Sequence, residues 1–116
     1  MKLFEEYRMM KELVPLATDR ILCVKVGKVI RENLYEMTRK YWKIKLERAS
    51  KATHVFAIVN SEVVAVYIPH KWKHSEGEHL GRIEFTGVED TNSEYIGKNV
   101  KSFFGRSPSP TLYINM

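Results

Sequence analysis

The chain has a single cysteine, Cys23, and six glycines scattered along its 116 residues. One cysteine cannot form a disulfide within the chain. Because Cys23 lies in the apolar run ILCVKV, we expect a buried, unreactive thiol and a reducing, cytoplasmic location. The glycines form neither GxGxxG nor GxxxxGK[ST], so the sequence does not indicate a phosphate-loop enzyme.

Long hydrophobic runs are absent as well. No segment approaches the roughly 18 apolar residues needed to span a bilayer. The first residues, MKLFEEYRMMKEL, lack the apolar core and the small-residue cleavage site of a signal peptide. We therefore expect a soluble protein that is not exported and has no membrane partner. The length fits one domain over residues 1–116.

Acidic residues are fewer than basic ones. Fourteen Asp and Glu stand against nineteen Lys and Arg, which gives a net charge of +5. This surplus favours polyanionic partners without identifying one, since many basic domains bind nothing acidic.

The first half of the chain alternates helical and extended patterns. Apolar residues three and four apart predict an amphipathic helix within residues 1–20, ended by Pro15. Residues 21–27 are rich in β-forming residues and predict a strand. A second helix is predicted from its N-cap Asn33 through Leu46.

The second half is richer in strand signals. Residues 53–69 predict a hairpin that turns at residues 60–62 and ends at Pro69. Further strands are expected within 79–89 and 111–116, whereas residues 94–104 fit neither the strand period nor the helix period. Short connections favour antiparallel neighbours. We therefore expect an α+β fold, a small curled antiparallel or mixed β-barrel with flanking helices.

The second predicted helix carries a basic and aromatic surface. At about 100° per residue, its core side holds Leu34, Met37, Tyr41 and Ile44, and its opposite side holds Tyr35, Arg39, Trp42, Lys43 and Leu46. One interpretation is a helix packed on both sides. The other is a nucleic-acid surface, on which Arg39 and Lys43, helped by Lys45 and Arg48, neutralise phosphates while Trp42 or Tyr35 stacks on a base.

Two further groups combine cations with aromatic rings. Lys71 and Lys73 flank Trp72, and a second group near Phe103 and Phe104 contains Lys98, Lys101 and Arg106. Three such groups favour one shared binding surface, although solvated faces often carry similar clusters.

Histidines are concentrated in one segment. His70, His74 and His79 lie within ten residues, together with Glu76 and Glu78. A metal site or an acid–base pair is conceivable, but Pro69 and the SEGE run indicate a loop, in which spacing does not fix ligand geometry. A solvated turn is the alternative we favour, and we expect no metal, cofactor or catalytic residue.

Several segments resemble small bacterial and phage-type domains that accompany some GIY-YIG nucleases and belong to the PUA, ASCH and EVE class of barrels. The similar segments span about residues 21–116 and are LYEMTRKYWKI, ATHVFAIVNSEVVAVYIPHKW, GRIEFTGVE, YIGKNV and LYIN. PUA-like barrels bind RNA or modified DNA, some with a flipped base in an aromatic pocket. The resemblance, together with the basic groups, marks as nucleic-acid-binding residues Arg39, Trp42, Lys43, Trp72, Lys73, Arg82, Phe85, Tyr95 and Lys98.

Two positions depart from that group. Lys43 stands where arginine is common, and Leu112 replaces an arginine of the terminal segment. The paired nuclease strands are missing, so nuclease activity does not carry over with the resemblance. We therefore expect a nucleic-acid-binding module, for RNA or DNA. The alternatives are a protein-interaction domain, such as a phage-encoded inhibitor of a host defence enzyme, and a small nuclease that uses the histidine segment.

Overall fold

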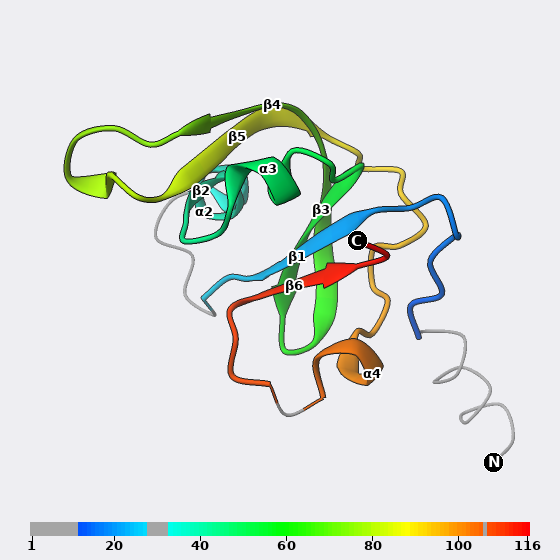
Figure 1. The fold of residues 1–116 in the computed structure, drawn as a ribbon. Coiled ribbons are helices and arrows are strands. Elements are labelled where there is room, and N and C mark those ends of the chain that lie inside the picture. Colours follow the sequence, from blue (N-terminus) through cyan, green and yellow to red (C-terminus); the bar gives the residue numbers. More distant parts are fainter. Residues whose placement is uncertain (1–11, 28–32, 106) are drawn as a thin grey trace, which may run out of the picture.

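The computed structural model describes residues 12–27, 33–105 and 107–116 (Figure 1). The predicted N-terminal helix falls mainly on residues 1–11, outside the described residues. Residues 12–20 contain no helix; Glu12 forms an isolated bridge with Asn99. In chain order the elements are β1 (Ile21–Lys25), α2 (Leu34–Arg39), β2 (Lys40–Trp42), α3 (Leu46–Ala49), β3 (His54–Val59), β4 (Glu62–His74), η1 (Gly77–His79), β5 (Ile83–Glu89), α4 (Lys101–Phe104) and β6 (Thr111–Ile114).

All six strands form one mixed sheet with the order β2-β5-β4-β3-β1-β6. The sheet curls into a half-barrel, and short helices lie against it (Figure 1). This confirms an α+β fold with a curled, mixed sheet. Four of the five strand pairs are antiparallel, but β1 and β3 are parallel, with Ile21 opposite His54 and Lys25 opposite Ile58.

The central strands are buried on both faces. In β1, Ile21 and Cys23 contribute to one core cluster while Leu22 and Val24 contribute to the other. Side chains alternate across a strand, so a continuous apolar run such as ILCV requires cover on both sides. Burial raises the pKa of the Cys23 thiol to about 12, as expected for an unreactive cysteine.

The predicted hairpin is confirmed, and its second strand is longer than expected. Asn60 and Ser61 both have positive φ angles, of 50° and 64°, as a two-residue turn between twisted strands requires. Pro69 does not end the strand. The register shifts between Pro69 and Lys71, and this irregularity accommodates the proline inside β4.

The second predicted helix is wrong beyond Arg39. Asn33 caps it as expected, because its side-chain oxygen accepts a hydrogen bond from the Glu36 amide at 2.9 Å. The helix ends after six residues, and Lys40–Trp42 pairs with the edge of β5 as β2. Ladder hydrogen bonds to a neighbouring strand therefore override the helical period of this segment.

The connection between the parallel strands covers one face of the sheet. It runs from Val26 to Thr53 and contains α2, β2 and α3, and its residues Leu34, Tyr35 and Ile44 pack against the cluster that contains Phe85 and Tyr67. Short α4 lies near β6 on the other face, where Phe104 is buried (Figure 1). No helix in the described ranges combines the length and the apolar character that crossing a bilayer requires.

Gly87 is the glycine whose replacement we expect to be costly. A Cβ atom at this position would lie 2.2 Å from the Ile68 carbonyl oxygen and 2.9 Å from the Pro69 Cα. Both atoms belong to the backbone of β4, so the strands must separate. We expect Gly87→Ala to lower the free energy of unfolding by about 2–3 kcal/mol. Urea titration of the wild-type and Gly87→Ala proteins measures this difference in the free energy of unfolding.

Thr86→Ala is the matched control because Thr86 is the exposed neighbour of Gly87 in β5. Its effect should stay within about 0.5 kcal/mol. Equal effects of the two substitutions would contradict the steric explanation.

Candidate nucleic-acid interface

Arg39, expected to contact phosphate, is bound within the protein. Its Nη2 donates to Glu84 at 2.7 Å, its Nη1 to Glu36 at 3.1 Å and its Nε to the Phe85 carbonyl oxygen at 2.8 Å. Its side chain is only 13% exposed. The guanidinium therefore fastens the end of α2 to the edge of β5, and its charge is balanced by two carboxylates.

Glu36 gathers two cations at the end of α2. Lys40 Nζ lies 2.9 Å from the same Glu36 oxygen that accepts from Arg39. The hydrogen bond from Lys40 lowers the pKa of Glu36. Partial burial opposes this effect and the charge of Arg39 reinforces it.

The two tryptophans lie on the same face of the sheet. Trp42 stands in β2 opposite Ile83, and its indole nitrogen donates to the Thr38 carbonyl oxygen at 2.7 Å. Trp72 stands in β4 opposite Phe85, with 5.0 Å between the ring centroids. Both indoles are half-buried against the same core cluster. Each has an exposed part, whereas the Phe85 ring is fully buried and belongs to the core.

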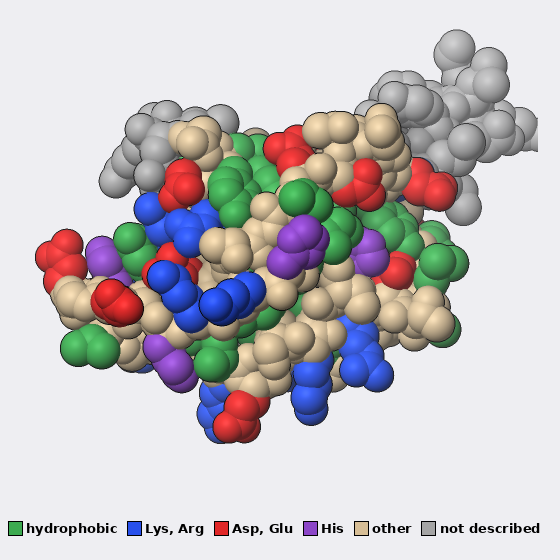
Figure 2. Space-filling model, turned by 90° about the horizontal axis from the view of Figure 1, so that it is seen from above, with side chains coloured by type: hydrophobic (Ala, Val, Ile, Leu, Met, Phe, Trp, Pro, Cys, Tyr) green, Lys and Arg blue, Asp and Glu red, His purple; other side chains and the backbone are tan. Residues whose placement is uncertain are grey.

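The group predicted around Trp72 is divided between two faces of β4. Lys73 pairs with Glu84 and Lys71 with Thr86, whereas Trp72 pairs with Phe85. Neighbouring side chains on a strand point to opposite faces. Lys71 and Lys73 are therefore exposed on the side away from Trp72. Figure 2 shows Lys and Arg side chains beside histidine in the middle of the face seen from above.

A groove that contains Lys45 and His74 lies at the end of β4 and the start of β5. The groove has a volume of about 440 Å³ and is lined by Ile44, Lys45, Leu46, Glu47, His74, Gly81 and Ile83. We call it the β2–α3 groove. Lys43 and Arg82 are exposed. In the chain, Lys43 directly precedes the lining residue Ile44, and Arg82 stands between the lining residues Gly81 and Ile83. The Arg82 guanidinium donates to the Tyr41 carbonyl oxygen at 3.1 Å. Glu47 is the one carboxylate among the lining residues.

The three clustered histidines have different surroundings. His70 is exposed at the irregularity of β4, and His74 lines the β2–α3 groove. His79 stacks on Tyr41, with 3.7 Å between the ring centroids. Among the described residues, no three His, Cys, Asp or Glu side chains are placed to hold a metal ion.

Tyr95 lies away from the tryptophans. Its hydroxyl donates to the buried carboxylate of Asp19, and its ring packs on Phe56 in the cluster on the opposite face of the sheet. Burial and the hydrogen bond to Asp19 raise the pKa of Tyr95. The half-buried Lys98 belongs to the same turn, where its amide donates to the Tyr95 carbonyl oxygen at 3.1 Å. These two residues therefore lie outside the β2–α3 groove.

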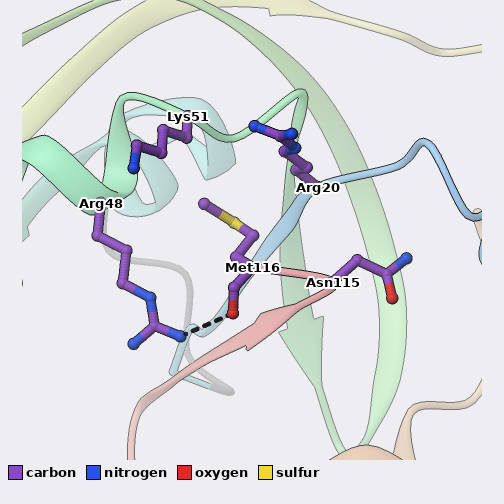
Figure 3. Close-up of a pocket in the computed structure, with 5 residues that line it drawn as sticks. All are labelled: Arg20, Arg48, Lys51, Asn115 and Met116. Atoms are coloured by element: carbon purple, nitrogen blue, oxygen red, sulfur yellow. Dashed lines mark hydrogen bonds between the residues drawn. The ribbon is translucent and has the colours of Figure 1, made fainter.

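A second basic pocket was not predicted as a unit. It has a volume of about 420 Å³ and is lined by Arg20, Arg48, Lys51, Asn115 and Met116 (Figure 3). Of these, the sequence pointed to Arg48 alone. Arg20 and Lys51 carry no motif. Lys51 lies near Arg48 because its amide donates to the Arg48 carbonyl oxygen in the turn after α3, whereas the pairing of β1 with β3 and β6 brings Arg20 and the C-terminal residues there. We call it the β1–β6 pocket.

No protein-family model matches the chain, and no curated protein and no solved structure is significantly similar to it. The resemblance to the domains that accompany GIY-YIG nucleases therefore stays a prediction.

Removal of the Arg39 guanidinium should destabilise the fold. Arg39→Gln leaves Glu84, which is 9% exposed, without its cation. We expect the free energy of unfolding to fall by about 2–3 kcal/mol. Lys43→Gln, a substitution of an exposed cation nearby, should have almost no effect. A stable Arg39→Gln protein that had lost nucleic-acid binding would instead show that Arg39 is a contact residue.

The lowered pKa of Glu36 predicts a pH dependence. A carboxylate whose pKa is lower in the folded state stabilises the protein above its unfolded value of about 4.3, and this contribution disappears as the pH falls through the folded pKa. Glu36→Gln should therefore cost about 0.5–1 kcal/mol at neutral pH and nothing once Glu36 is protonated. Thermal melts of the wild-type and Glu36→Gln proteins, from neutral pH down through the pH at which Glu36 is protonated, measure this difference in stability. A difference that grows in acid would contradict the assignment.

Proposed function

We propose that this protein binds single-stranded nucleic acid, RNA or DNA, along the β2–α3 groove. The observation that carries the proposal is a set of basic side chains, in the groove lining and next to it in the sequence, that no carboxylate in the described part of the chain pairs with. Lys45 and His74 line the groove, Lys43 and Arg82 are exposed chain neighbours of lining residues, and Glu47 is the single lining carboxylate. None of the three Lys and Arg side chains forms an ion pair with a carboxylate of the described residues.

Single strands suit this site better than duplexes. A groove of about 440 Å³ has room for a few nucleotides at most. Proteins that bind single strands place cations along the backbone and aromatic rings under the bases. Trp42, which pairs with the lining residue Ile83, is half-buried and leaves part of its ring surface exposed. In this proposal Lys43, Lys45 and Arg82 bind phosphates and Trp42 stacks on a base.

The proposal uses part of the residue set that the sequence marked. Arg39 and Phe85 support the fold, Tyr95 packs on the other side of the sheet, and Lys98 belongs to the same turn as Tyr95. Lys73 stands on the outer face of β4 and contributes to the field that attracts a polyanion. Trp72 lies beside Phe85, where its exposed part is available to a flipped or modified base.

We further propose that the half-barrel is a PUA-like domain of a protein that works in a reducing cytoplasm. The curled mixed sheet with helices on its face supports the first part, and the buried thiol of Cys23 supports the second.

Salt dependence tests the binding function. With a fluorescently labelled single strand, anisotropy should show an affinity that falls with salt at a slope of about −0.7 per phosphate contacted. Lys43→Gln combined with Lys45→Gln should weaken binding and reduce the slope by about 1.4. Lys101→Gln, an exposed lysine of α4, is the matched control. Binding that ignores salt, or an equal loss in the control, would refute the proposal.

A further inference from the structure

The β1–β6 pocket brings together basic side chains that no described Asp or Glu side chain neutralises. Its lining contains the cations Arg20, Arg48 and Lys51 and no side-chain carboxylate. None of these three forms an ion pair with a carboxylate of the described residues. Arg20 precedes β1, whereas Arg48 and Lys51 belong to α3 and the turn after it, and the three side chains surround Met116 in Figure 3. The three basic side chains therefore meet around one hollow.

One cation, Arg48, is held in place before any ligand arrives, and the backbone that carries a second, Arg20, is fixed. The Arg48 guanidinium lies 4.1 Å from the centre of the Tyr113 ring and donates to the Met116 carbonyl oxygen at 3.1 Å. The backbone of Arg20 is fixed by Thr53, whose hydroxyl accepts from the Arg20 amide at 2.9 Å and whose amide donates to the Arg20 carbonyl at 2.7 Å. Pre-organised donors bind an anion with a smaller loss of conformational entropy.

The pocket also has an apolar component. The Met116 side chain extends between Arg20 and Lys51, whereas the Asn115 side chain points away and donates to the Leu16 carbonyl oxygen at 3.1 Å (Figure 3). Tyr113 packs beneath Arg48. A volume of about 420 Å³ exceeds the size of a lone phosphate and admits part of an organic group as well.

We propose that the β1–β6 pocket binds a phosphate monoester. A monoester carries up to two negative charges and three terminal oxygens, which match three cations better than the single charge of an internal phosphodiester. Arg48 and Arg20 offer planar, forked donors that suit phosphate oxygens, and Lys51 adds a point charge. The ligand's organic part lies against Met116.

Two sources could supply this group, a free nucleotide or the phosphorylated end of a nucleic acid. The second source rests on the proposed function. It is geometrically favoured because α3 separates the two sites, with Glu47 lining the β2–α3 groove and the adjacent Arg48 lining the pocket. A strand that leaves the groove across α3 would place its terminal phosphate in the pocket.

Binding measurements with matched ligands test the proposal. Anisotropy compares one 3′-labelled single strand with a 5′-phosphate or a 5′-hydroxyl, and calorimetry measures adenosine 5′-monophosphate and inorganic phosphate. Arg20→Gln combined with Lys51→Gln removes two cations whose side chains form no hydrogen bond within the described residues, and Lys101→Gln is the control. Thermal melts verify that each variant is folded.

We expect the 5′-phosphate to bind about tenfold more tightly than the 5′-hydroxyl, the gain of one charge-assisted contact. The double variant should abolish this preference and the control should keep it. Nucleotide binding that is lost in the double variant, without any strand preference, would support the pocket with a free nucleotide as its source. The proposal is overturned if neither the 5′-phosphate nor the nucleotide binds in a manner that depends on Arg20 and Lys51.

The two proposals fail separately. Absence of binding by the 5′-hydroxyl strand refutes the groove function and leaves the nucleotide measurement as the test of the pocket. A second combination of results is that the 5′-hydroxyl strand binds in a manner that depends on Lys43 and Lys45, while a terminal phosphate adds no affinity and the nucleotide does not bind. That result supports the groove function and refutes the phosphate site in the pocket.

Discussion

The parallel pairing of β1 with β3 is the constraint on which the rest of the fold depends. Parallel neighbours cannot be joined by a tight turn, so the chain must leave β1 and return in the same direction. Here the connection from Val26 to Thr53 contains α2, β2 and α3. This one excursion covers a face of the sheet, supplies an edge strand on the far side and carries a large share of the exposed cations.

Neighbouring cations on this excursion have different roles. Arg39 forms ion pairs with Glu36 and Glu84, and Lys40 forms one with Glu36. The Arg39–Glu84 pair links the connection to β5. The next cations, Lys43 and Lys45, follow β2 and face solvent beside the groove. Arg48 and Lys51 then belong to the β1–β6 pocket. Within thirteen residues, the first basic side chains thus form ion pairs that stabilise the fold, and the later ones have no carboxylate partner among the described residues. The presence or absence of a nearby carboxylate determines which role each cation has.

The sequence identified features that depend on local chemistry. The cap at Asn33 and the turn at Asn60 and Ser61 follow from the preferences of their own side chains and backbone. The buried strands β1 and β3 follow from their apolar runs. The helix beyond Arg39 was wrong because its outcome depends on β5, a strand that is more than forty residues away. Pro69 was misinterpreted as a strand end because the opposite Gly87 could not be known to accommodate a bulge.

The candidate sites were harder to predict for the same reason. An exposed arginine and a paired one look alike in a sequence, so Arg39 could not be separated from Arg82 without the position of Glu84. A helical projection placed Trp42 opposite the core side of a helix, packed or exposed, whereas Trp42 stands in β2 and pairs with Ile83. The β1–β6 pocket combines residues from three distant segments, and only the sheet order brings them together.

The pairing pattern also distributes the entropy of chain closure unevenly. In the β3–β4 hairpin, Val59 and Glu62 meet across two residues, whereas β1 meets β3 only after thirty-three positions, as between Ile21 and His54. Loop-closure entropy grows with the logarithm of loop length, so the register of β1 carries the greater cost. The apolar side chains that β1 buries on both faces must offset it. Ordering the β1–β3 pair is thus entropically more demanding than ordering the β3–β4 hairpin.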